Sequence, residues 1–221
     1  MTANQASAQP TLRIQLIGGF RLLLDATPIR IRSTRLQSLL TCLTLQRHAP
    51  ISRQQLAFLF WPESTESQAR TNLRQLLHHL HQTVPDSEHF LLDDGQSLAW
   101  RADATVASDV ADFEAALARV ANSGNRRMNS QSRQALTQAV DLYQGDLAPD
   151  CYDDWIEAER ESLRRQYVQA LGRLIHLLEN ERSYAKAIDY ARKLTQADPL
   201  DEDGWRTLMR LYALDGRRSD A

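Results

Sequence analysis

The chain has 221 residues, of which 43% are hydrophobic and 24% are charged, and its formal net charge is −2. This length can bury one large core or two small ones, and we expect two domains. No run of about eighteen apolar residues occurs, and the first ten residues lack the basic-then-apolar order of a secretory signal. These features exclude a membrane-spanning helix and export by that route, and predict a soluble protein.

Charge is distributed unevenly along the chain. Residues 11–84 contain nine arginines and three acids, a net charge of +6, whereas residues 108–221 contain 16 basic and 20 acidic side chains, a net charge of −4. A basic first part and an acidic second part indicate two separate roles. The first part is the candidate for an anionic partner.

Strands and then helices are predicted after a disordered leader at residues 1–10. Apolar residues alternate with polar ones between Leu12 and Ile31 and are interrupted by turn residues, which indicates two or three antiparallel strands. Three amphipathic helices follow, at about 34–46, from the N-cap Ser52 to Pro62, and from Ser64 or Ser67 to Pro85.

A β-hairpin is predicted after the third helix. Residues 90–92 and 98–100 are short apolar runs joined through Asp94-Gly95, a strong turn signal. Strands, three helices and a terminal hairpin in this order are typical of a winged helix-turn-helix, with a generic α+β domain as the alternative. We therefore expect an α+β winged-helix DNA-binding domain at 11–104.

Residues 105–221 are predicted to form an all-α, tetratricopeptide-like domain, with a flexible loop at 122–132. Residues 171–187 align with 205–221 at an offset of 34 residues, which is the tetratricopeptide period. Because Ala221 falls where the second helix of a repeat should begin, we expect this domain to be truncated at its C-terminal end. Its final helix would then leave Leu208, Leu211 and Tyr212 without a packing neighbour.

The third helix has a polar face with no acid and no lysine, only hydrogen-bonding side chains and arginine. Its leucines define the core side, and the opposite side carries the candidates for reading DNA bases: Ser67, Gln68, Thr71, Arg74, Gln75 and His78. Arginine suits the hydrogen-bonding edge of guanine and glutamine suits that of adenine. An ordinary solvated helix surface is the alternative.

Four arginines lie near helix starts or at the edge of this face and are candidates for contacting the DNA backbone: Arg32, Arg35, Arg53 and Arg70. A solvated basic rim explains each of them about as well. In the hairpin, Gln96 and Arg101 are candidates for wing contacts, although the acidic pair Asp93-Asp94 at its tip weakens that hypothesis.

Catalytic and metal sites find little support. Among His78, His79 and His81, the pair His78 and His81 has the i, i+3 spacing that could bind a metal. The sequence places no third or fourth ligand of suitable type near this pair. Cys42 and Cys151 lack metal-binding spacing and are interpreted as reduced, mostly buried thiols. No glycine-rich phosphate loop and no hydrolase or metalloprotease motif occurs. We therefore expect no enzymatic activity, no cofactor and no metal.

The chain resembles the Streptomyces antibiotic regulatory protein (SARP) type of bacterial activator. Its first part resembles the OmpR-like winged helix of that family in "LIGGFRLLLD", "LAFLFWP", "QARTNLRQLLHHLHQ" and "FLLDDGQSLAW". Its second part resembles the family's bacterial transcriptional activation domain in "DLYQGDLAPD", "DDWIEAERESLRRQY" and "ADPLDEDGWRTLMRLYALDGRRSDA".

This resemblance implies a DNA-binding transcriptional activator of the bacterial cytoplasm, associated with the nucleoid. Residues 67–84 would be the recognition helix and "WPESTES" the loop before it. The expected partners are double-stranded promoter DNA with repeated sites, RNA polymerase, and other protomers on DNA, but no membrane. Relatives often continue into an ATPase. A tetratricopeptide-type interaction scaffold within a larger signalling regulator is the alternative function.

Overall fold

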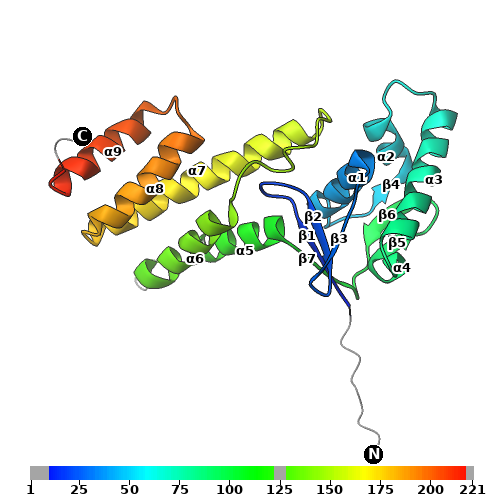
Figure 1. The fold of residues 1–221 in the computed structure, drawn as a ribbon, viewed down its shortest axis with the longest axis horizontal. Helices are drawn as coiled ribbons and strands as arrows, with labels where there is room; N and C mark the ends of the chain where they lie inside the picture. The colour runs from blue at the N-terminus through cyan, green and yellow to red at the C-terminus, as the bar shows by residue number, and fades with distance from the viewer. Residues whose placement is uncertain (1–9, 122–127, 218–221) are drawn as a thin grey trace, which may run out of the picture. The chain divides into compact units, whose positions relative to one another are not determined.

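The computed structural model describes residues 10–121 and 128–217, which belong to two compact units (Figure 1). The first unit contains the described residues up to Val110 together with 147–157. The second contains those of 111–146 and 158–221. Apart from Pro10, the leader predicted at residues 1–10 lies outside the described residues.

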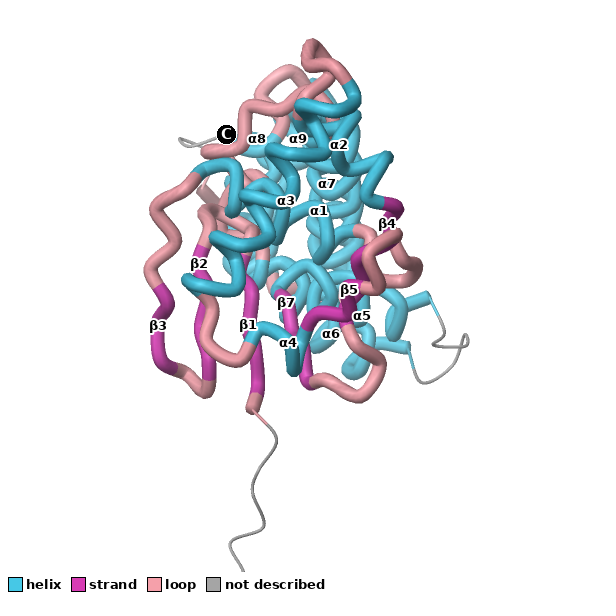
Figure 2. Tube along the Cα trace, turned by 90° about the vertical axis from the view of Figure 1, so that its right-hand side faces the viewer, coloured by secondary structure: helices cyan, strands magenta, loops and turns pink. Residues whose placement is uncertain are grey.

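A four-stranded sheet begins the first unit. Strands β1 (Thr11–Gln15), β2 (Arg21–Leu24) and β3 (Thr27–Ile29) form the expected antiparallel meander. A fourth strand, β7 (Thr105–Ser108), pairs in parallel with β1, so the order is β3-β2-β1-β7 (Figure 2). These four residues, expected at the start of the second domain, therefore complete the sheet of the first.

Three helices follow the meander at the predicted places: α1 (Thr34–Leu45), α2 (Arg53–Phe60) and α3 (Glu66–Thr83). Each begins with a hydroxyl side chain that accepts a hydrogen bond from a first-turn N–H, as N-caps do. These caps are Ser33, Ser52 and Thr65, and Ser52 also forms a capping box with Gln55. The helices therefore begin where their sequences supply a polar cap.

The hairpin forms after α3 and is completed by a third strand. Strands β5 (Leu91–Asp93) and β6 (Ser97–Trp100) pair antiparallel, and β4 (Ile51–Ser52) pairs with the other edge of β6. A single helical turn, α4 (Ser87–Phe90), leads into β5. The α+β winged-helix prediction is confirmed, although neither β4 nor α4 was foreseen.

Residues 147–157, here called the strap, pack in the first unit although they follow two helices of the second. At one end of the strap, the Ala148 N–H donates to the Leu16 carbonyl oxygen over 2.7 Å, and Leu147 forms a β-bridge with Ile17. Further along, the Cys151 Sγ lies 3.4 Å from the Ser38 Oγ of α1. The first unit is therefore built from two separate stretches of sequence.

Aromatic packing and an ion pair hold the other end of the strap. The Asp153 carboxylate lies 2.7 Å from the Arg35 guanidinium, which also lies 5.8 Å from the ring centroid of Phe60 and 5.9 Å from that of Trp61. Trp155 meets Phe60 edge to face, with 6.2 Å between ring centroids. These contacts join the strap to the start of α1 and the end of α2.

A buried carboxylate fixes the end of β1 within the first unit. Asp109, at the beginning of α5, accepts hydrogen bonds from the Leu16 and Ile17 backbone N–H groups over 2.9–3.0 Å and from that of Val110 over 2.9 Å. Because buried polar groups are costly when unpaired, these three donors explain why an acid is tolerated there.

The second unit is helical in its described part, as predicted. Its helices are α5 (Asp109–Ala121), α6 (Met128–Leu142), α7 (Ile156–Asn180), α8 (Tyr184–Ala197) and α9 (Glu202–Leu214). The prediction of a loop at 122–132 was wrong for 128–132, which begin α6, and residues 122–127 lie outside the described residues. No described helix is long and apolar enough to span a bilayer.

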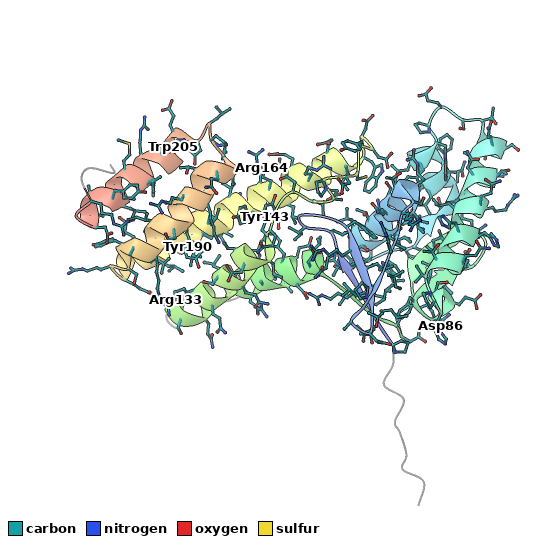
Figure 3. All side chains as sticks on the ribbon, in the orientation of Figure 1. Asp86, Arg133, Tyr143, Arg164, Tyr190 and Trp205 are labelled. Atoms are coloured by element: carbon teal, nitrogen blue, oxygen red, sulfur yellow. The ribbon has the colours of Figure 1, made fainter. Side chains whose placement is uncertain are left out.

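The predicted repeat corresponds to the second half of α7 and to α9, with α8 between them. Leu208, Leu211 and Tyr212, expected to lack a packing neighbour, are buried, and the Arg192 Nε of α8 donates to the Tyr212 hydroxyl over 2.9 Å. That expectation was wrong because α8 covers this stripe. The exposed apolar residues of α9 are instead Trp205, Met209 and Leu214, and Figure 3 shows Trp205 on this helix.

The strap generates a prediction for stability. We expect Trp155→Ala to lower the free energy of unfolding by about 1–3 kcal/mol, because it removes a half-buried aromatic side chain that packs against Phe60. Denaturant unfolding followed by fluorescence of the remaining tryptophans measures this change. Tyr152→Ala is the matched control, since Tyr152 is an aromatic residue of the same strap that is 88% exposed. Equal midpoints for the two variants would contradict the structural role of Trp155.

Candidate nucleic-acid interface

The helix α3 separates an apolar face from a polar one. Its buried residues are Ala69, Leu73, Leu76, Leu77 and Leu80. All six residues predicted to read bases are exposed: Ser67, Gln68, Thr71, Arg74, Gln75 and His78. The helical periodicity of the sequence therefore correctly identified which side chains face away from the core.

The six exposed side chains differ in how much hydrogen-bonding capacity they retain. The Thr71 hydroxyl donates to the Ser67 carbonyl oxygen over 3.0 Å, and a ring nitrogen of His78 lies 2.9 Å from the Gln82 amide nitrogen. Within the described parts of the chain, the side chains of Gln68, Arg74 and Gln75 make no hydrogen bond or ion pair. The Ser67 hydroxyl likewise makes none within those parts, since only the backbone carbonyl of Ser67 is engaged. Gln68, Arg74 and Gln75 are therefore the long side chains of this face whose hydrogen-bonding groups are available to a ligand.

Of the four arginines predicted to contact the DNA backbone, three have carboxylate partners. Arg35 pairs with Asp153 of the strap, Arg53 pairs with Asp93 of the hairpin over 2.5 Å, and Arg70 pairs with Glu66 one turn earlier in α3 over 2.5 Å. Arg32 is exposed and has no such partner within the described ranges. Two tertiary ion pairs and one pair within α3 thus reduce the number of unpaired cations that these positions offer to phosphates.

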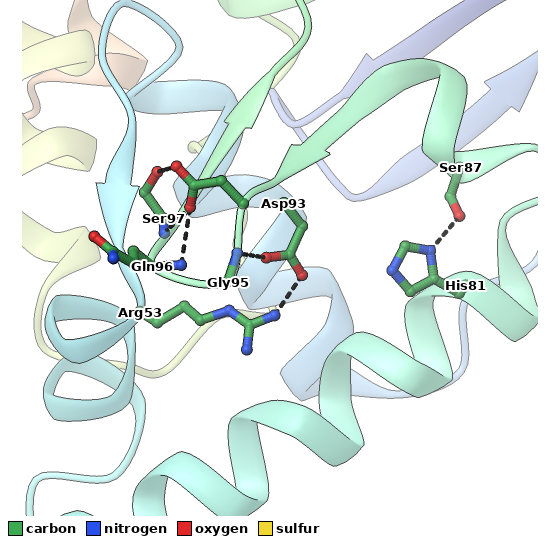
Figure 4. A network of polar contacts seen from close by, with 8 residues as sticks. Arg53, His81, Ser87, Asp93, Gly95, Gln96 and Ser97 are labelled. Atoms are coloured by element: carbon green, nitrogen blue, oxygen red, sulfur yellow. Dashed lines mark hydrogen bonds and ion pairs between the residues drawn. The ribbon is translucent and has the colours of Figure 1, made fainter.

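The two acidic side chains at the tip of the hairpin form hydrogen bonds and an ion pair within the first unit (Figure 4). Asp93 accepts a hydrogen bond from the Gly95 N–H over 3.0 Å as well as pairing with Arg53. Asp94 accepts from the backbone N–H groups of Ser97 over 2.6 Å and Gln96 over 2.8 Å. Gly95 has a φ of +82°, a conformation that favours glycine. Both carboxylates therefore stabilise the turn.

The two predicted wing residues flank β6 in sequence: Gln96 precedes it and Arg101 follows it. The Gln96 side chain is exposed, and it is the backbone carbonyl oxygen of Gln96 that accepts the Arg53 backbone N–H over 2.8 Å. The Arg101 guanidinium pairs with Asp103 over 3.2 Å, and this contact lowers the pKa of the Asp103 carboxyl. Gln96 is thus the more available of the two side chains.

The histidines and cysteines of the first unit do not assemble a metal centre. His81 Nδ1 lies 2.7 Å from the Ser87 hydroxyl (Figure 4), and no described group of three or more His, Cys, Asp or Glu residues could hold a metal ion. Both cysteines are buried, and burial raises the pKa of the Cys42 thiol to about 12. The thiol of Cys42 is therefore protonated at neutral pH and behaves as a small apolar side chain.

Comparison with protein-family models matches residues 108–221 to the bacterial transcriptional activator domain. The chain belongs to this family. Comparison with curated protein sequences gives no match. Among solved structures, the fold is similar to Mycobacterium tuberculosis EmbR in complex with a low-affinity phosphopeptide, with a TM-score of 0.75 and 22% sequence identity. The alignment covers 96% of this chain and 57% of the EmbR chain.

The activator domain follows the winged helix in this chain, which is the SARP-type arrangement predicted from the sequence. The family match begins at Ser108, the last residue of β7. The strap belongs to the matched activator domain by sequence and to the winged-helix unit by packing. This family is one of transcriptional regulators and is not an enzyme family.

Sequence reasoning missed the residues that hold the activator-domain strap and the hairpin tip. Asp153, which pairs with Arg35, is 118 residues away from it in sequence, and Trp155 is similarly far from Phe60. Local sequence patterns therefore could not predict these contacts. The partnership of Arg53 with Asp93 had a weak signal, because an arginine at a helix start and an acidic turn were both visible in the sequence. Their proximity follows only from the pairing of β4 with β6.

The hairpin tip generates a prediction about pH. The N–H groups of Ser97 and Gln96 stabilise ionised Asp94 and lower the pKa of its carboxyl below the ordinary value of 3.8. This contribution to stability is therefore present above pH 3.8 and is lost as the pH falls through the lower, folded-state pKa. An NMR titration of the Asp94 carboxyl carbon tests this. The Ser97 hydroxyl also donates to the Asp94 carboxylate over 3.1 Å, so we expect Ser97→Ala, which removes only this third donor, to move the midpoint partly back. A wild-type midpoint at or above 3.8 would contradict the prediction.

Proposed function

We propose that this protein is a sequence-specific DNA-binding transcriptional activator that contacts promoter DNA through α3 and recruits RNA polymerase. It would act in the bacterial cytoplasm, on the nucleoid. The observation that carries the proposal is the exposed, unpaired set formed by Gln68, Arg74 and Gln75 on one face of the winged-helix α3.

The chemistry of this set suits the major groove of DNA. A guanidinium can donate two hydrogen bonds to one guanine, and a carboxamide can both donate to and accept from one adenine. In α3 the carboxamides of Gln68 and Gln75 and the guanidinium of Arg74 have no competing partner within the described chain. We infer that Ser67, Thr71 and His78 border this contact, since they share the exposed face.

The backbone contacts are fewer in this proposal than sequence alone would suggest. Arg32 is exposed beside the start of α1 and is the first candidate for a phosphate. Arg70 shares its charge with Glu66 in an exposed pair, and such pairs contribute little energy in water, so a phosphate can compete for this guanidinium. With few cations on each protomer, binding of several protomers to repeated promoter sites is favoured.

Replacement of Arg74 tests base reading. We expect Arg74→Ala to weaken binding to the cognate site by roughly 10- to 100-fold, since a bidentate arginine–guanine contact contributes about 1–3 kcal/mol of discrimination. Binding to unrelated DNA should change much less. The cognate site is first mapped on the genome, and fluorescence anisotropy then measures both affinities at several salt concentrations, because phosphate contacts make affinity salt-dependent.

Arg173→Ala provides the matched control, because it removes an exposed arginine from α7 of the second unit. Its affinities should equal those of the wild type. Equal losses on cognate and unrelated DNA for Arg74→Ala would make Arg74 a phosphate contact. Absence of DNA binding by the wild-type protein at low salt would overturn the proposed function and favour the interaction scaffold.

Recruitment of RNA polymerase is tested separately by transcription with purified components. We expect the wild-type protein to increase transcription from a template that carries its site. Arg74→Ala should lose activity in proportion to the site occupancy it loses, and should regain it at concentrations that restore occupancy. Full occupancy without any increase in transcript would contradict the activator role while leaving DNA binding intact.

A further inference from the structure

Arg53, the first residue of α2, connects this helix to the tip of the hairpin. Its guanidinium lies 2.5 Å from the Asp93 carboxylate, and the side chains of these two residues are only 27% and 20% exposed (Figure 4). Its backbone N–H donates to the Gln96 carbonyl oxygen over 2.8 Å. One residue therefore contacts both sides of the hairpin turn, through its side chain and through its backbone.

The start of α2 has few donors left for a phosphate. The Ser52 N–H donates to the Gln55 side chain, the Arg53 N–H donates to Gln96, and the Gln55 N–H donates to the Ser52 hydroxyl. A helix N-terminus attracts anions through unsatisfied N–H groups. Here three of those groups are already engaged within the protein, and the adjacent guanidinium already has a carboxylate.

The contacts of Asp93 extend to the rest of the turn. Its second oxygen accepts the Gly95 N–H over 3.0 Å, and the neighbouring Asp94 binds the next two backbone N–H groups. The pairing of β4 with β6 brings the residues before Arg53 alongside Ser97 and Leu98. Movement of Arg53 would therefore displace the whole turn that presents the exposed Gln96 side chain.

We propose that the Arg53–Asp93 ion pair, here called the lock, fixes the position of the β5–β6 hairpin, the wing, relative to α2. Arg53 is then a positioning residue and not a phosphate contact. This inference rests on the proposed DNA binding and specifies which wing group meets the DNA. Gln96 is that group, and the Arg53–Asp93 ion pair determines where it lies.

The two roles of Arg53 predict opposite effects of removing Asp93. For a lock, Arg53→Ala and Asp93→Asn each weaken cognate binding by a similar factor, about tenfold for a coupled contact, and leave the salt dependence unchanged. The reversed pair, Arg53→Asp with Asp93→Arg, recovers part of the loss. For a phosphate contact, Asp93→Asn strengthens binding, and Arg53→Ala lowers the slope of log affinity against log salt by about one.

Hydrogen exchange of the free protein supplies a readout that does not need DNA. With a lock, the backbone amides of residue 53 and Gly95 exchange faster in both single variants. In the reversed pair only the amide of residue 53 is slowed again, because Asp93→Arg removes the carboxylate that accepts the Gly95 N–H. Arg133→Ala is the matched control, since it breaks a 2.5 Å ion pair with Glu181 in the second unit and should change neither the hairpin exchange nor the affinity.

Unchanged exchange at the hairpin in both single variants would overturn the lock, as would tighter DNA binding by Asp93→Asn. If the wild-type protein does not bind DNA, the proposed function fails, whereas the exchange data still decide whether Arg53 and Asp93 hold the wing. The two failures are therefore distinguishable.

Discussion

The first unit depends on the contact between the strap and the helices α1 and α2. Asp153 and Arg35 form an ion pair at the edge of an aromatic cluster, where the guanidinium also faces the Phe60 and Trp61 rings. Such a guanidinium gains from the negative faces of the rings as well as from the carboxylate. Because Phe60 is the last residue of α2, the strap fixes the point from which the chain turns toward α3.

The same contact places acidic residues of the strap in the unit that contains the basic first part of the sequence. The strap brings Asp150, Asp153, Asp154 and Glu157 into a unit whose N-terminal part has a net charge of +6. Asp153 neutralises Arg35, and Asp93 neutralises Arg53. The distinction between a basic first part and an acidic second part holds for the sequence, but the folded unit mixes the two. Its cations therefore favour a small number of defined contacts over general attraction to DNA.

The sequence patterns correctly predicted the elements that are stabilised by contacts between residues close in sequence. The periodicity of leucines located α1, α2 and α3 and correctly separated the buried face of α3 from its exposed face, and Asp94-Gly95 located the hairpin. The strands β4 and β7 were missed because each is stabilised by pairing with a strand distant in sequence, β6 and β1 respectively, with no adjacent turn to mark it. The carboxylate partners of Arg35 and Arg53 were missed for the same reason, and only the fold brings these charges together.

The helix α2 is held at both ends by contacts that are distant in sequence. At its start, the Arg53 side chain and backbone are joined to the hairpin, and at its end Phe60 packs against Trp155 of the strap. Only the short turn 61–65 separates it from α3, and the cap Thr65 closes that turn. The orientation of α3 therefore follows from α2, and the hairpin is tied to the same helix. Because α2 is joined both to the hairpin and to the turn before α3, it relates the position of the Gln96 side chain to that of the exposed face of α3. The proposed contact with a groove and its adjacent backbone needs both to be positioned together.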